Sequence, residues 1–274
     1  TDFAGDVMPF ALPRPFLTNL LWTFLDIRQH LAIKMEPKVA ERRKMIAGNW
    51  KMNGLREEGV ALAGNLAAQA LASPPACDVV VCPPATLLAK IDRAFEASAI
   101  ALGGQDCHAA EKGAHTGDVS AEMLRDAGCQ YVIVGHSERR TDHGEVNAVV
   151  QAKASAVQRA NMTAIACVGE TGGERDAGET LDVVARQVAE SLPQGADGAN
   201  TVVAYEPVWA IGSGRTPTLA EIAAVHHHIR ATLATQCGPA ADGMRVLYGV
   251  SVNATTANEI LAVDAVDGAL VGGA

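Results

Sequence analysis

The chain has 274 residues, of which 49% are hydrophobic and 4% aromatic. This length suits one large domain or two small ones, and the apolar fraction is sufficient for a sizeable core packed by small aliphatic side chains. The formal net charge of −9 argues against a general binder of nucleic-acid backbones, although a local site on an acidic protein can still hold a small phosphorylated molecule.

Residues 1–43 precede any regular pattern. The segment PFALPRPF is broken by prolines, and LLWTFLDIRQHLAIKM has the spacing of a weak amphipathic helix. The apolar stretch 16–33 contains Asn19, Asp26, Arg28 and His30, so it does not predict a membrane span. It also lacks the basic start of a signal peptide. We therefore expect residues 1–43 to form an irregular extension, ahead of one domain at 44–274.

From Lys44 onward, short apolar runs alternate with longer alanine-rich stretches. The runs are nearly continuous, which is typical of strands covered on both faces. The stretches between them repeat apolar residues every three or four positions, which is typical of helices. We expect strands within 44–50, 78–84, 99–106, 131–137, 163–170, 201–207, 245–251 and 268–273, and helices within 57–72, 86–97, 144–160, 179–192 and 218–236.

Alternating strands and helices imply parallel crossovers, and eight of them favour a closed (β/α)₈ TIM barrel. An open doubly wound sheet with a nucleotide site would need a GxGxxG turn after its first strand, and GNWKMNG does not fit that pattern. The sequence stops four residues after Leu270, right after the expected eighth strand. The prediction is therefore a barrel whose final helix is missing, which leaves apolar surface uncovered between the first and seventh helices.

The six cysteines form no CxxC pair, and their spacing fits neither a zinc site nor a small disulfide framework. Most lie in the apolar runs, so we expect reduced and mostly buried thiols in a cytoplasmic protein. They are Cys77, Cys82, Cys107, Cys129, Cys167 and Cys237.

Polar residues interrupt the apolar runs where the strands end, which is the end of a TIM barrel that carries the chemistry. Taken singly, a lysine there is commonly a solvated loop residue, a histidine commonly has a structural hydrogen bond, and a glycine commonly serves a turn. Together on one rim they indicate a site. The residues are Asn49, Lys51, His136, Ser137, Glu206, Ser251, Asn253, Gly272 and Gly273.

This set suits proton transfer next to a carbonyl. Glu206 can act as a base toward a carbon acid, the imidazole of His136 can polarise a carbonyl, and Lys51 can stabilise a developing enediolate. Backbone N–H groups of the glycine- and serine-rich turns can hold a phosphate. The predicted substrate is a small phosphorylated sugar.

Long segments of the chain resemble the signature segments of the triosephosphate isomerase family. They are AGNWKMNG (47–54), GGQDCHAAEKGAHTGDVSAEML (103–124), VIVGHSERR (132–140), CVGE (167–170), AYEPVWAIGSGRTPT (204–218) and GALVGGA (268–274). The resemblance runs from about Lys44 to Ala274 and implies an isomerase that interconverts dihydroxyacetone phosphate and D-glyceraldehyde 3-phosphate in glycolysis and gluconeogenesis.

The resemblance also implies a role for each matching residue. Glu206 would be the base, and His136 would be the electrophile, kept neutral by N–H groups at the start of the SERR helix. Lys51 and Asn49 would bind the substrate. Three residues would support this set: Ser137 and Cys167 beside the base, and Glu138 beside Lys51. The phosphate would be held by Gly212, Ser213, Ser251, Gly272 and Gly273.

By the same resemblance, the segment after Glu206 would be a lid that excludes water during the reaction. Its stiff hinge would be Pro207, Val208 and Trp209, and its tip would include Ala210, Ile211 and Gly214. Residues 103–118 would form a loop that reaches a second copy, with Thr116 next to the partner's Asn49 and Lys51. This implies a homodimer that needs no metal and no organic cofactor.

Two features depart from the family pattern or add to it. Val250 stands where a glycine is usual before the phosphate-binding serine, and it would be strained if its φ were positive. The run His226, His227 and His228 could suggest a metal site, but adjacent helical positions point to different faces, so we expect none. Two other functions stay open: a different phosphate-binding barrel enzyme, and a barrel that serves only as a dimerising scaffold.

Overall fold

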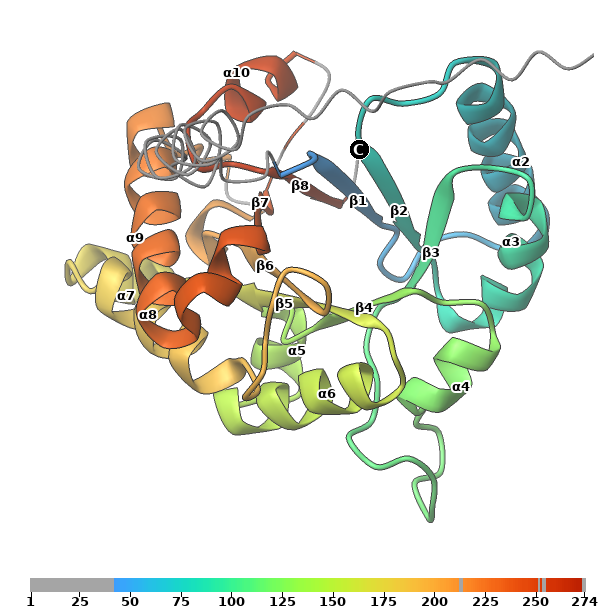
Figure 1. Ribbon diagram of the computed structural model, residues 1–274, viewed down its shortest axis with the longest axis horizontal. Coiled ribbons are helices and arrows are strands. Elements are labelled where there is room, and N and C mark those ends of the chain that lie inside the picture. The colour runs from blue at the N-terminus through green and yellow to red at the C-terminus, as the bar shows by residue number, and fades with distance from the viewer. Residues whose placement is uncertain (1–41, 212–213, 251, 253–254, 273–274) are drawn as a thin grey trace, which may run out of the picture. The chain divides into compact units, whose positions relative to one another are not determined.

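The computed structural model describes residues 42–211, 214–250, 252 and 255–272 (Figure 1). Residues 42 and 43 are thus the only part of the expected extension 1–43 that is described. Eight strands each lie within one of the expected apolar runs. They are β1 (Met45–Asn49), β2 (Asp78–Cys82), β3 (Ile100–Gly104), β4 (Tyr131–Val134), β5 (Thr163–Val168), β6 (Thr201–Tyr205), β7 (Arg245–Tyr248) and β8 (Gly268–Gly272).

The eight strands form a closed barrel in chain order, and every pair is parallel. The barrel closes between its first and last strands: Asn49 lies opposite Cys82 of β2 on one side and Gly272 of β8 on the other. The prediction of a (β/α)₈ barrel is therefore confirmed.

The helices surround the barrel (Figure 1). Among the described residues, the five expected long helices are present together with four short ones, of which the resemblance implied only the SERR helix. The helices are α2 (Arg56–Ala72), α3 (Leu88–Phe95), α4 (Ala121–Asp126), α5 (Ser137–Asp142), α6 (Asn147–Arg159), α7 (Gly172–Asp176), α8 (Thr180–Ser191), α9 (Leu219–Cys237) and α10 (Ala257–Leu261), with 3₁₀ turns at Ala85–Leu87, Val208–Ala210 and Gly238–Gly243.

Alternate residues of each strand pack into two different apolar layers. In β5, Ile165 and Cys167 point into the barrel interior, whereas Ala164, Ala166 and Val168 pack against the surrounding helices. Because both faces of each strand are covered, both sets must be apolar, which explains the continuous runs in the sequence. The core thus leaves polar residues to the ends of the strands.

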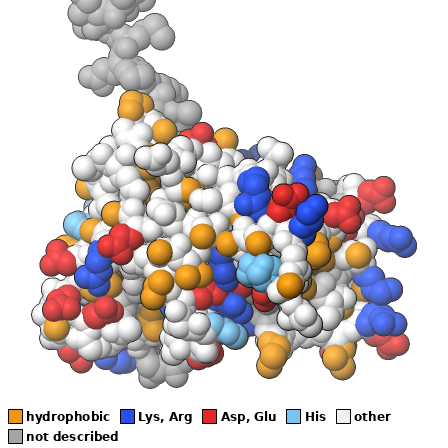
Figure 2. Space-filling model, turned by 90° about the horizontal axis from the view of Figure 1, so that it is seen from below, with side chains coloured by type: hydrophobic (Ala, Val, Ile, Leu, Met, Phe, Trp, Pro, Cys, Tyr) orange, Lys and Arg blue, Asp and Glu red, His pale blue; other side chains and the backbone are white. Residues whose placement is uncertain are grey.

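Basic and acidic side chains are interspersed on the described face shown in Figure 2. Within the described ranges, no helix combines the length and the apolar character that a membrane crossing requires.

Candidate functional site

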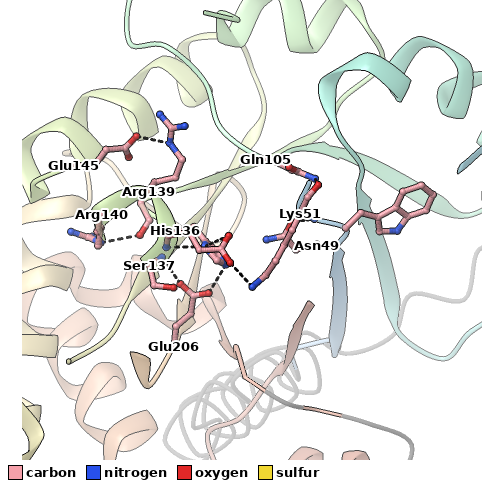
Figure 3. Close-up of polar contacts among 12 residues, drawn as sticks. Asn49, Lys51, Gln105, His136, Ser137, Arg139, Arg140, Glu145 and Glu206 are labelled. Carbon is pink, nitrogen blue, oxygen red and sulfur yellow. Dashed lines mark hydrogen bonds and ion pairs between the residues drawn. The ribbon is translucent and has the colours of Figure 1, made fainter. Parts of the chain in front are cut away.

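The ends of β1, β4 and β6 bring Lys51, His136 and Glu206 to one rim of the barrel (Figure 3). Each residue follows its strand by one or two positions, and all strands are parallel, so their C-terminal ends meet at the same face. Three side chains separated by up to 155 positions in sequence therefore lie in one site.

Glu206 is almost completely buried, with 3% of its surface exposed. One carboxylate oxygen, Oε1, lies 2.9 Å from Nε2 of His136, and the other, Oε2, accepts the backbone N–H of Ser137 at 3.1 Å. Its own backbone N–H donates to the carbonyl of Val168 at 2.7 Å. Pro207 then ends the strand, because it has no N–H for the ladder. The carboxylate is thus oriented by donors from β4 and α5.

His136 caps the N-terminus of α5, where its Nδ1 accepts the backbone N–H of Glu138 at 3.2 Å. An accepting Nδ1 carries no proton, so the ring in this geometry is neutral and donates its Nε2–H to Glu206. Burial, the largest single influence, lowers the pKa of His136, but the nearby carboxylates of Glu206 and Glu138 together raise the pKa above its ordinary value. The backbone N–H at Nδ1 opposes that rise, as expected at a helix start.

Lys51 has a φ of 53°, a backbone conformation that is costly for a side chain other than glycine. Two neighbours hold it there: Oδ1 of Asn49 accepts its N–H at 2.9 Å, and Nε2 of Gln105 donates to its carbonyl at 2.8 Å. Its Nζ pairs with Oε1 of Glu138 at 2.7 Å. Lys51 is therefore held both at its backbone and at its ammonium group.

Three glycines leave room for the polar side chains. A Cβ on Gly169 would lie 1.7 Å from the carbonyl oxygen of Glu206, and one on Gly249 would lie 2.9 Å from its Cγ. A Cβ on Gly272 would lie 2.9 Å from Cε of Lys51. Gly169 is thus required by the backbone at Glu206, whereas a side chain at Gly249 or Gly272 would displace the side chain of Glu206 or Lys51.

The segment after Glu206 is anchored on Glu170, which is completely buried. Its backbone carbonyl accepts the N–H of Val208 at 3.1 Å, and its Oε1 accepts the indole Nε1–H of Trp209 at 2.8 Å. The hydroxyl of Tyr205 lies 3.2 Å from both carboxylate oxygens. Burial first, and then this carboxylate, raise the pKa of Tyr205, so the hydroxyl stays protonated and donates.

The cysteines are free thiols, and four of the six are buried. Cys167 is fully buried, and burial together with the nearby Glu206 carboxylate raises the pKa of its thiol well above the usual range. Such a thiol stays protonated and is a poor nucleophile. Cys167 is therefore a packing residue beside Glu206.

Four of the five expected phosphate-binding residues, Gly212, Ser213, Ser251 and Gly273, lie outside the described residues, as does Asn253. Gly272 is described and ends β8 beside Lys51. Val250 is buried and is not among the described non-glycine residues with positive φ, so the strain that we considered for it is not present.

The three consecutive histidines of α9 differ in their burial. His226 is buried, His227 is exposed and His228 is half-buried. Nδ1 of His226 lies 3.2 Å from the carbonyl of Ala265, and its Nε2 has no hydrogen-bond partner in the described part of the chain. Burial lowers the pKa of His226 to about 4, so the ring is neutral near pH 7.

One group of potential metal ligands lies on the loop between β3 and α4. The ligand atoms of His108, His115 and Asp118 lie within 4.8 Å of one another. However, Nδ1 of His108 accepts the N–H of Ala110 at 3.0 Å, which leaves its proton on Nε2, the nitrogen that faces Asp118. A metal at that nitrogen would require the opposite tautomer, so the hydrogen bonding does not favour a metal here.

The arrangement combines a buried carboxylate, a neutral imidazole donor and a fixed ammonium group on one rim. The sequence prediction did not include Gln105, Gly169, Gly249 or Glu170 among the site residues. The GGQ and CVGE segments contain three of them, but nothing in the sequence alone indicates that Gln105 bonds the carbonyl of Lys51.

Comparisons with known proteins agree with this geometry. The family model described as triosephosphate isomerase matches residues 44–274. Triosephosphate isomerases of Ruegeria sp. (strain TM1040) and Rhodopseudomonas palustris (strain BisA53) are 58% and 57% identical over 233 and 235 residues, which is 85% of this chain and 92% of each relative. The crystal structure of triosephosphate isomerase from Bartonella henselae has a TM-score of 0.76 and 43% identity, and covers 84% of this chain and 92% of that one.

Proposed function

This chain belongs to the triosephosphate isomerase family and interconverts dihydroxyacetone phosphate and D-glyceraldehyde 3-phosphate, and we propose that Glu206, His136 and Lys51 carry the reaction. The observation that supports this assignment most strongly is the 2.9 Å contact between the Glu206 carboxylate and the neutral His136 ring, on the rim that also carries Lys51. A base and a proton donor side by side are what an aldose–ketose proton transfer requires.

In the proposed mechanism, Glu206 removes a proton from the substrate carbon next to the carbonyl and returns it to the neighbouring carbon. His136 donates its Nε2–H to the carbonyl oxygen and takes back the proton of the neighbouring hydroxyl oxygen, which becomes the new carbonyl, so that negative charge does not develop on a bare oxygen. Because Nδ1 of His136 already accepts a backbone N–H, the ring reaches the substrate with its proton on the correct nitrogen.

Lys51 would attract the anionic substrate and stabilise the enediolate, with Asn49 beside it. Its strained backbone is held by Asn49 and Gln105, so the ammonium group needs little rearrangement when substrate arrives. The substrate phosphate would be bound by Gly272 together with Gly212, Ser213, Ser251 and Gly273. The segment from Pro207 to Gly214 would act as the lid over that phosphate.

We further propose that the protein acts as a homodimer in the cytoplasm. The loop that follows β3 projects from the barrel, and Thr116 on it is exposed (Figure 1). Met52 and Leu55, after β1, are 96% and 76% exposed, which is unusual for large apolar side chains unless a partner covers them. A cavity of about 620 Å³ beside Lys51 offers space for the Thr116 loop of a second copy. The face from which this loop projects also carries apolar side chains among the charged ones (Figure 2).

The proposed roles are tested by following isomerisation of glyceraldehyde 3-phosphate in a coupled assay. Glu206→Asp withdraws the carboxylate by about one methylene, and a displacement of about 1 Å can cost on the order of 100-fold in rate. The matched control is Glu57→Gln, an exposed carboxylate on α2. A Glu206→Asp variant as active as the control would refute the role of Glu206.

The two other functions that the sequence left open, a different phosphate-binding barrel enzyme and a dimerising scaffold, are not supported by the comparisons, because the matching family model and the relatives are triosephosphate isomerases. The mass of the folded chain in light scattering tests the proposed dimer. An active monomer would refute the proposed dimer without affecting the assignment of the site.

A further inference from the structure

Trp209 lies between groups from several elements. Its indole donates to Glu170, the Cζ of Arg175 on α7 lies 3.9 Å from the ring centroid, and the Cζ of Arg215 lies 4.9 Å from it. The tryptophan itself is 8% exposed. A guanidinium at this distance over an indole is a cation–π contact, and tryptophan is the ring that binds cations best. Arg175 thus holds the face of the ring while Glu170 holds its edge.

Arg175 also reaches the far side of the loop between β6 and α9. Its Nη2 donates to Oε1 of Glu221, which lies in the first turn of α9. The other oxygen of Glu221 accepts the backbone N–H of Thr218 at 2.7 Å and completes the capping box of that helix. The guanidinium of Arg175 therefore connects Trp209, shortly after β6, with Glu221 at the start of α9.

The base is close to this connection along the chain. Trp209 follows Glu206 by three positions, Pro207 restricts the segment between them, and the N–H of Val208 is bound to Glu170. A short and restricted segment transmits a rotation of the indole to the Glu206 backbone. The carboxylate of Glu206 in turn must stay within reach of both His136 and the substrate.

We propose that Arg175 is a positioning residue for the isomerase reaction, which sets the resting place of the Glu206–Trp209 segment by stacking on Trp209 and pairing with Glu221. The inference rests on the proposed role of Glu206 as the base. It assigns to Arg175 a function that its surface position would not suggest, since its side chain is 24% exposed.

The exposure of Arg175 allows positioning to be separated from stability. Glu221 is 40% exposed, so it stays solvated and keeps its capping bonds when the guanidinium is removed. Exposed ion pairs of this kind add little to folding stability. Replacement of Arg175 by methionine, which keeps the aliphatic part of the side chain but removes the guanidinium, should therefore change the melting temperature little while it lowers the rate.

The expected effect of Arg175→Met is a fall of about tenfold in kcat, which corresponds to the loss of a partly desolvated cation–π contact, with a smaller change in KM. Arg175→Lys keeps a cation near the ring and should recover part of the loss. Arg186→Met removes an exposed arginine from α8 and should leave the rate unchanged. If Arg175→Met lowers kcat no more than Arg186→Met does, the proposal is wrong.

A double-mutant cycle then tests whether Arg175 acts through Trp209. In a Trp209→Leu background the additional effect of Arg175→Met should shrink to less than about twofold, because the ring that receives the cation is absent. An undiminished effect in that background would mean that Arg175 works by another route. The chain has three tryptophans, and Arg175 stacks on Trp209. The change in tryptophan fluorescence emission caused by Arg175→Met should therefore also disappear in the Trp209→Leu background.

Wild-type activity separates the two proposals. A wild-type chain that does not isomerise the triose phosphates refutes the roles proposed for the site and the catalytic part of this inference together. An active wild type whose kcat and emission are both unaffected by Arg175→Met refutes the inference alone.

Discussion

Gly169 offers a sharp test of how Glu206, the proposed base, is positioned. It follows β5, and the N–H and carbonyl of its backbone are both held by the side chain of Gln187, at 2.7 and 3.0 Å. A Cβ at this position would lie 1.7 Å from the carbonyl oxygen of Glu206 and 2.6 Å from its carbonyl carbon. Because both of these atoms belong to the backbone, Gly169→Ala cannot be accommodated by a side-chain rotation.

The displacement can be worked out from these distances. A carbon and an oxygen that are not bonded need about 3.3 Å between them, so the backbone segments at Gly169 and Glu206 must separate by roughly 1.5 Å. A misplacement of about 1 Å at a catalytic group costs on the order of 100-fold in rate. We therefore expect Gly169→Ala to lower kcat/KM by at least about 100-fold in the coupled assay.

The matched control for this prediction is Gly173→Ala, four residues further along. Gly173 lies in α7, is exposed, and would place its Cβ where no atom lies within 4 Å. Alanine in a helix should if anything stabilise the fold, by about 0.5 to 1 kcal/mol. Circular dichroism melting confirms that each variant is folded before its rate is measured. A folded Gly169→Ala variant with the rate of Gly173→Ala would refute the reasoning.

Three further variants test separate parts of the structure. Gln105→Leu leaves the carbonyl of Lys51 without its donor, so we expect a loss of about 1 to 3 kcal/mol in the free energy of unfolding by urea and a lower kcat/KM. Gly249→Ala brings a Cβ to 2.9 Å from the flexible Cγ of Glu206, so kcat/KM should fall, but less than for Gly169→Ala; an equal fall would contradict this. The pKa of His226 is about 4 in the folded chain and about 6.5 in the unfolded chain. Because the folded state disfavours the proton on His226, the free energy of unfolding falls as the pH drops from about 6.5 toward 4. The total loss is about 3 kcal/mol. His226→Gln should flatten this part of a urea-unfolding profile against pH, and an unchanged slope would refute the assignment.

The strands could be predicted from the sequence because each needs two apolar faces. Every predicted run contains its strand, but the strands end one to three residues early: the run 131–137 ends as a strand at Val134, and 201–207 ends at Tyr205. In both cases the missing residues include the polar groups of the site. The apolar pattern predicts a strand that continues up to the polar residues. The hydrogen-bonded ladder between strands ends earlier, where the chain turns toward the site.

The short helices could not be predicted in the same way. Helices α4, α5, α7 and α10 have five or six residues, which is too short for a repeat of three or four positions to show. Capping residues give the better signal for them. Ser120 caps α4 and Thr171 forms a capping box with Glu174 in α7, and both patterns can be seen in the sequence.

The main polar residues of the site could be predicted because each breaks an apolar run. Gln105 could not be predicted as their partner, since it supports Lys51 across 54 positions of sequence through a backbone carbonyl. The same limit applies to Gly169, because the glycine is required by the backbone of another strand. Polarity in a run indicates which residues face the site, whereas the contacts that hold them depend on the closed barrel.

The contact between Glu206 and His136 affects the protonation of His136 differently before and after substrate binds. In the structure the carboxylate raises the pKa of His136, which favours a charged ring. The backbone N–H at Nδ1 favours a neutral one. In the proposed reaction, when Glu206 turns from the ring to a substrate carbon, the first influence weakens and the second remains, so the neutral form of the ring is favoured more strongly at the step where a carbonyl oxygen needs its proton. On this reasoning the α5 N-terminus, rather than burial alone, selects the protonation state of His136, and a residue without an N–H at position 138 should impair kcat more than substrate binding.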